Sequence, residues 1–107
     1  MNSNVKEKVS RSLRAVTPSG EELTVYVAVG EPYQREDGAW AASVTIEPLE
    51  EFIPDIVGGG SWQATKIAMN HSTFYLKRFI EKGGKLFFSD SEETGKPFTL
   101  QDIDEFF

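Results

Sequence analysis

The sequence contains no cysteine and a single histidine, His71, among 107 residues. Without cysteine the chain has no disulfide and no thiolate for a metal, which is typical of a reducing compartment. A histidine site would need carboxylates as its remaining ligands, and none stands at ligand spacing from His71. We therefore expect no metal, no cofactor and an ordinary surface histidine.

Long apolar runs are absent as well. Residues 1–12 are too polar for a signal peptide, and no apolar stretch approaches the roughly 20 residues of a membrane-spanning helix. With 39% hydrophobic and 12% aromatic residues, the composition favours a folded chain. It predicts a single compact domain over residues 1–107, located in the cytoplasm and not bound to a membrane.

Catalytic motifs are missing too. There is no nucleophile elbow, no calcium-binding Asp-x-Asp loop and no convergent set of acid, base and nucleophile. The three glycines at 58–60 precede a helix, as in an anion-binding loop, but no lysine follows at phosphate-loop spacing. We expect that the protein is not an enzyme and has no catalytic residues.

Basic residues are outnumbered, 11 to 17, and the net charge is −6. Residues 61–85 are basic, whereas residues 47–60 contain four acids and no base, and residues 86–107 contain six acids and one base. Part of this pattern is expected to neutralise itself, acidic tail against basic helix. The remaining excess disfavours nucleic acid and favours a basic protein partner.

Three stretches alternate as β-strands. They cover residues 5–16, 23–29 and 40–46, and turn or loop residues separate them. Residues 31–38 are expected to form a polar loop, residues 85–89 a short fourth strand and residues 90–96 an exposed loop. Short connections between such strands predict an antiparallel meander with one apolar face.

One long helix is predicted to cover that face. Ser61 is a suitable N-cap, and Gly83 with Gly84 supplies a left-handed C-terminal end. Projected at about 100° per residue, an arc of apolar and small side chains faces the sheet. Its members are Trp62, Thr65, Ala68, Met69, Ser72, Tyr75, Leu76, Phe79 and Ile80. We expect Trp62, Met69 and Leu76 to pack on the sheet, and Lys66, His71, Lys77 and Arg78 to be exposed.

A second, shorter helix is predicted over residues 99–107. Thr99 and Asp102 have the spacing of a capping box, and Phe98 with Ile103 that of a hydrophobic staple. The predicted fold class is therefore α+β: an antiparallel three- to four-stranded meander, covered on one face by one long helix, with a short C-terminal helix.

The candidate binding surface is the acidic loop, by which we mean residues 47–57. It interleaves carboxylates with apolar side chains that follow no core periodicity, as interface centres and rims do. The simpler interpretation is a solvated acidic surface. The candidate partner-binding residues are Glu47, Glu50, Glu51, Phe52 and Asp55, with Asp90, Glu92 and Glu93 from a second loop.

Residues 25–68 resemble a small bacterial domain family of uncharacterised function. The resemblance consists of a strand ending in Val-x-x-Gly-x-Pro, an aromatic-led strand and a Gly-x-x-Ser-x-Gln-Ala-x-x-x-Ala helix start. These positions are Val27, Gly30 and Pro32, then Trp40, then Gly58, Ser61, Gln63, Ala64 and Ala68. The resemblance implies strands plus a helix, and no activity.

Two classes of function remain. The chain is similar in character to bacterial immunity proteins, which bind and neutralise toxin domains such as nucleases, and a basic toxin would suit its charge. The alternative is a small structural or ligand-binding domain that forms a homodimer and is acidic only for solubility.

Overall fold

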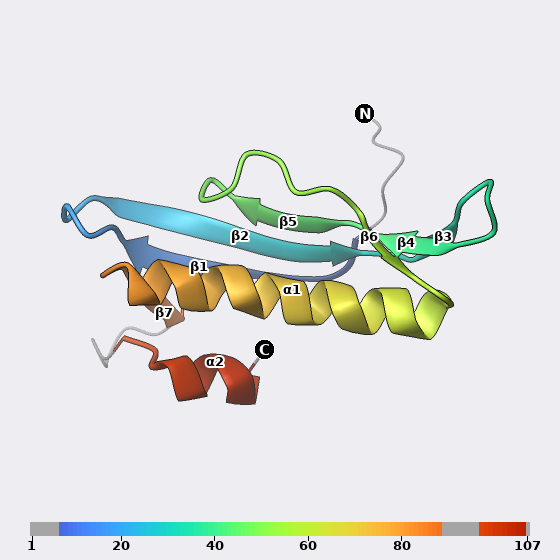
Figure 1. The fold of residues 1–107 in the computed structure, drawn as a ribbon. Helices are drawn as coiled ribbons and strands as arrows, with labels where there is room; N and C mark the ends of the chain where they lie inside the picture. Colours follow the sequence, from blue (N-terminus) through green and yellow to red (C-terminus); the bar gives the residue numbers. More distant parts are fainter. Residues whose placement is uncertain (1–6, 89–96, 107) are drawn as a thin grey trace.

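The computed structural model describes residues 7–88 and 97–106. Its elements in chain order are β1 (Glu7–Val16), β2 (Glu22–Gly30), β3 (Tyr33–Gln34), β4 (Trp40–Ala42), β5 (Val44–Glu47), β6 (Ile56–Gly58), α1 (Ser61–Glu81), β7 (Lys85–Phe88) and α2 (Leu100–Phe106). Strands and helices are segregated, and α1 runs along one face of the strands (Figure 1). The predicted α+β class is confirmed.

The larger sheet has the strand order β5-β2-β1-β7, and all of its pairs are antiparallel. β1 and β2 are joined by the predicted turn, in which the Gly20 N–H donates to the Thr17 carbonyl at 2.9 Å. Alternation then aligns Leu13, Val25 and Ile46 on the face toward α1, where all three are fully or almost fully buried. The antiparallel sheet is confirmed, but its fourth strand, β7, crosses over to pair with β1 and does not continue the meander after β5.

The predicted third strand is divided between two sheets, which corrects the expectation of one strand over 40–46. β4 belongs to a smaller sheet of order β3-β4-β6, whereas β5 pairs with β2. The chain changes sheet at Ser43, whose carbonyl accepts a hydrogen bond of 3.0 Å from the Gly30 N–H. β3 lies within residues 31–38, which were expected to form only a loop, and β6 was not expected.

α1 packs on the sheets through small residues. Its buried side chains are spaced four apart, at Ala64, Ala68, Ser72 and Leu76. The approach is very close at Gly58, where a Cβ atom would lie 2.7 Å from the Ala64 backbone nitrogen. The buried arc is therefore narrower than predicted. Trp62, which was expected in the core, is 84% exposed, and Met69 is 37% exposed.

The N-terminal end of α1 differs from the prediction, whereas its C-terminal end agrees with it. Ser61 is not the N-cap: Gly60 occupies that position, without a side-chain capping bond, and the Gln63 side chain accepts from the Gly59 N–H instead. The C-terminal end is as predicted. Gly83 adopts a φ of 102°, and its N–H bonds the Ile80 carbonyl while that of the following glycine bonds Phe79, a Schellman motif.

α2 lies beside α1 (Figure 1). The capping box is confirmed, because the Asp102 N–H donates to Thr99 Oγ1 at 3.1 Å and the Thr99 N–H to Asp102 Oδ2 at 2.9 Å. Ile103 is fully buried. Lys77 Nζ lies 2.5 Å from Asp104 Oδ1, so the acidic helix partly neutralises the basic one.

Candidate functional site

The acidic loop begins where β5 ends and runs along the outer edge of that strand. The Glu50 N–H donates to the Ile46 carbonyl at 2.8 Å, and Ile53 is buried at the edge of the core. Phe52 stands between these two anchored positions and is 80% exposed. The loop is therefore held at both sides of an aromatic ring that points to solvent.

Three of the predicted acidic residues line one cavity together with Phe52. Glu47, Glu50 and Glu51 line a cavity of about 200 Å³ together with Phe52 and residues of β5. Glu47 and Glu51 are exposed and Glu50 is half-buried, and none of the described residues that line the cavity is basic. The structure thus brings four of the predicted site residues together at one edge of the larger sheet.

Asp55 lies apart from that cavity and has a partner that sequence reasoning missed. The Tyr33 hydroxyl donates a short hydrogen bond to Asp55 Oδ2. Tyr33 and Val57 flank Ala41 in one row across the smaller sheet, and both are 45% exposed. The hydrogen bond raises the pKa of Tyr33 above its ordinary value, with partial burial and the charge of Asp55 adding to the rise and Arg35 opposing it.

Asp90, Glu92 and Glu93 lie outside the described residues. The second loop of the predicted binding surface is therefore not part of the site described here, which consists of residues on β5, β3, β6 and the acidic loop.

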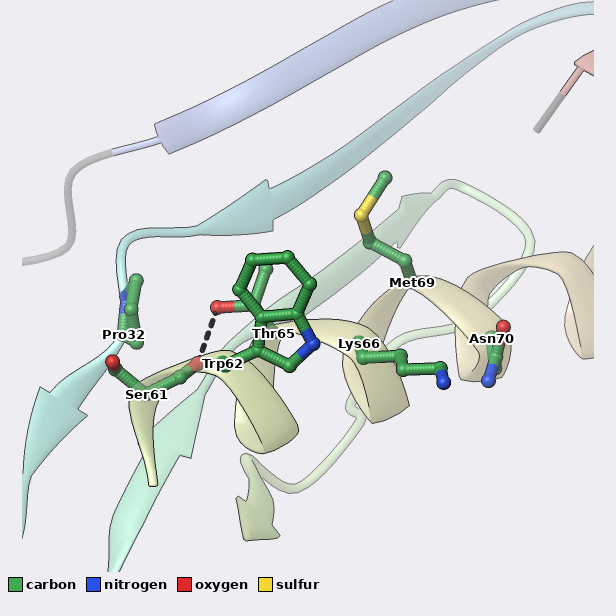
Figure 2. A pocket seen from close by; sticks show the side chains of 7 residues that line it. All are labelled: Pro32, Ser61, Trp62, Thr65, Lys66, Met69 and Asn70. Atoms are coloured by element: carbon green, nitrogen blue, oxygen red, sulfur yellow. Dashed lines mark hydrogen bonds between the residues drawn. The ribbon is translucent and has the colours of Figure 1, made fainter. Parts of the chain in front are cut away.

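A second hollow lies at the start of α1, where no binding residue was predicted. Trp62, Lys66, Met69 and Asn70 project from the first turns of α1, with Pro32 opposite, around a pocket of about 520 Å³ (Figure 2). Ser61 and Thr65 complete the lining, and the Thr65 hydroxyl donates to the Ser61 carbonyl at 2.8 Å. Helical periodicity could not reveal this pocket, because it placed Trp62 and Met69 on the core side.

Of the four α1 side chains expected to be exposed, Lys66 and Arg78 are exposed, whereas Lys77 and His71 are half-buried. The ring centroid of His71 lies 6.2 Å from that of Phe74 and 5.6 Å from that of Tyr75, and the Arg78 guanidinium lies 6.0 Å from the Phe74 ring centroid. Within residues 7–88 and 97–106 no group of three or more His, Asp or Glu side chains is placed to hold a metal ion. No helix in these ranges is long and apolar enough to cross a membrane.

Comparison with protein-family models, with curated proteins and with solved structures finds no match. The resemblance of residues 25–68 to a small bacterial family therefore stays a prediction.

Proposed function

We propose that this chain is a non-enzymatic binding protein whose acidic loop docks a basic protein partner. In the form that the charge pattern favours, it is an immunity-type inhibitor that binds and neutralises a basic toxin domain. The proposal assigns the contact to Phe52 as the apolar anchor, with Glu47, Glu50 and Glu51 around it and Asp55 beside Tyr33.

The exposure of Phe52 is the observation that carries this proposal. A phenylalanine that leaves 80% of its surface in water gains little from folding, since its stabilising contribution comes from burial. Its neighbours Glu50 and Ile53 are held by the β5 edge, so the ring is presented by an anchored loop. Pre-positioned aromatic anchors at the centre of a polar rim are typical of interface hot spots.

The surrounding charge supports a basic partner. The described lining of this cavity contains three glutamates and no basic residue, so it attracts lysine or arginine side chains. Complementary charge also accelerates the encounter with a basic partner and suppresses binding of acidic competitors. An exposed aromatic ring next to carboxylates also suits a guanidinium, which can stack on the ring while it pairs with a carboxylate.

The proposal is tested with the product of the gene that neighbours this one, as purified protein, by kinetic binding measurements at several salt concentrations. Replacing Glu50, Glu51 and Asp55 by the neutral amides should slow association and flatten its salt dependence. Phe52→Ala should mainly accelerate dissociation, because loss of a buried anchor acts on the bound state.

Two controls separate docking from general charge and surface effects. Neutralising Glu21, Glu22 and Glu31, which are exposed outside the loop, makes the same change in net charge and should alter association much less. Phe74→Ala removes a different exposed ring, on α1. The competing interpretation, a structural or ligand-binding homodimer, predicts that every variant leaves association unchanged. Absence of binding at micromolar concentration and low salt would refute the inhibitor proposal.

A further inference from the structure

Two hollows with a shared lining residue lie along one side of α1, and together we call them the groove. The first is the pocket beside Trp62, whose lining Figure 2 shows. The second hollow has a volume of about 310 Å³ and shares Met69 with the first. The lining of the second hollow consists of Val9, Ser10, Arg11, Val27, Ala28, Val29, Met69 and Ser72. The groove therefore extends from the first turn of α1 to the N-terminal half of β1, where Val9 is 47% exposed.

The charge of this groove is opposite to that of the whole chain. Among the described residues, no aspartate or glutamate lines either hollow, whereas Lys66 and Arg11 belong to the lining. The first turn of α1 also contains no acidic residue. In a chain with 17 acidic residues this groove thus combines an apolar floor with basic side chains. It suits an occupant that is apolar and acidic.

The molecule already places such a segment on the same side of α1. Asp104 of α2 pairs with Lys77 at 2.5 Å, while Ile103 of the same helix is fully buried. Lys66 precedes Lys77 by eleven residues, which is about three turns and about 16 Å along one stripe of the helix. The groove beside Lys66 therefore continues the surface on which α2 is docked.

The β1 edge of the larger sheet is also divided into a paired part and a part that lines the groove. β7 pairs with β1 over residues 13–16. In the part of the chain that the structure describes, no strand lies beside residues 9–12 on that edge. Among the described residues, β7 thus covers residues 13–16 of this edge, whereas residues 9–11 line the groove.

We propose that the groove is a docking site for an acidic, apolar-anchored helical segment of a partner protein, which lies on α1 in line with α2. Its apolar residues contact Trp62 and Met69, and a carboxylate pairs with Lys66 as Asp104 pairs with Lys77. Tryptophan and methionine suit this role, because one supplies a large rigid contact and the other adapts to its neighbour. The inference does not depend on the proposed function, which uses the opposite charge and other residues.

The probe is a synthetic peptide with the sequence Leu-Gln-Asp-Ile-Asp-Glu-Phe-Phe, that of residues 100–107, added to the full-length protein at low salt. The indole N–H signals of Trp40 and Trp62 are followed by NMR, and Trp62→Phe assigns them. We expect a saturable shift of the Trp62 signal that weakens as salt is added. Lys66→Glu should reduce affinity by about threefold to fivefold, as expected for one exposed ion pair.

Lys82→Glu makes the same charge change on an exposed residue outside the groove and should leave affinity within about twofold of the unaltered chain. A peptide with asparagine and glutamine in place of its acids should bind more weakly than the acidic peptide. A peptide that displaced α2 would respond to Lys77→Glu and leave Trp62 unshifted, which would contradict the proposal. Absence of any Trp62 shift at millimolar peptide would overturn it, as would concentration-dependent dimerisation through Trp62 in analytical ultracentrifugation.

Discussion

At the scale of single residues, the bond between Tyr33 and Asp55 gives the site a signature in pH. The Tyr33 hydroxyl must lose its donated hydrogen bond when it ionises, so the pKa of Tyr33 lies above its ordinary value of 10.0. A raised pKa in the folded state means that the stabilisation is complete below the pKa of the unfolded chain. It is lost as the pH rises through the folded value.

This prediction is measured by the ultraviolet absorbance of the phenolate during alkaline titration. The difference between the unaltered chain and Tyr33→Phe isolates Tyr33 from Tyr26 and Tyr75. Asp55→Asn should lower the titration midpoint toward the ordinary value, because it removes both the charged acceptor and its negative potential. An unchanged midpoint in Asp55→Asn would show that Asp55 is not the partner that raises the pKa of Tyr33.

The pair of Tyr33 and Asp55 also shows what could not be predicted from the sequence. Tyr33 and Asp55 are 22 positions apart and meet only because β3 and β6 flank β4 in one small sheet. A two-residue strand has no periodicity to detect, so Tyr33 was assigned to a loop. Phe52 could be singled out beforehand, because it interrupts a run of acids without fitting a core pattern.

At the scale of elements, the position of α1 in the chain could be predicted from the sequence. Its buried face could be predicted only in part. The Gly83–Gly84 stop and the long apolar periodicity are local signals, and both proved correct. Trp62 was misplaced because a projection of the helix does not reveal how wide a face the sheet covers. Likewise, alternation continues without a break through Ser43, so the pattern could not show that β4 and β5 enter different sheets.

The width of that face is tested by two substitutions in α1. Leu76 is fully buried, and Leu76→Ala should lower the free energy of unfolding by about 2–5 kcal/mol, as large-to-small core changes do. Trp62→Ala removes a larger side chain from the surface and should change that free energy by no more than about 0.5 kcal/mol. Chemical denaturation measures both. If Trp62→Ala lowered the free energy of unfolding more than Leu76→Ala, Trp62 would belong to the core after all.

At the scale of the whole molecule, the acidic C-terminal segment, residues 97–106, packs onto the sheet and the basic helix α1. The Phe98 N–H donates to the Leu86 carbonyl at 2.8 Å, which fastens the start of this segment to β7. Ile103 then joins the main hydrophobic core, and Lys77 pairs with Asp104. Although α2 has only seven residues, too few to be stable alone, tertiary packing holds it.

If α2 unfolds together with the rest of the protein, a substitution at its buried anchor, Ile103, must also destabilise the smaller sheet, which lies at the far end of α1. Ile103→Ala should lower the free energy of unfolding by about 2–5 kcal/mol, because a fully buried isoleucine is truncated. Asp104→Asn is the control, since a partly exposed ion pair contributes about 1 kcal/mol or less. In a Trp62→Phe background, Trp40 fluorescence reports on the smaller sheet and circular dichroism on the helices. Both transitions should shift together in Ile103→Ala. A loss of helical signal that leaves the Trp40 transition in place would mean that α2 unfolds by itself and that the remaining elements form the stable domain.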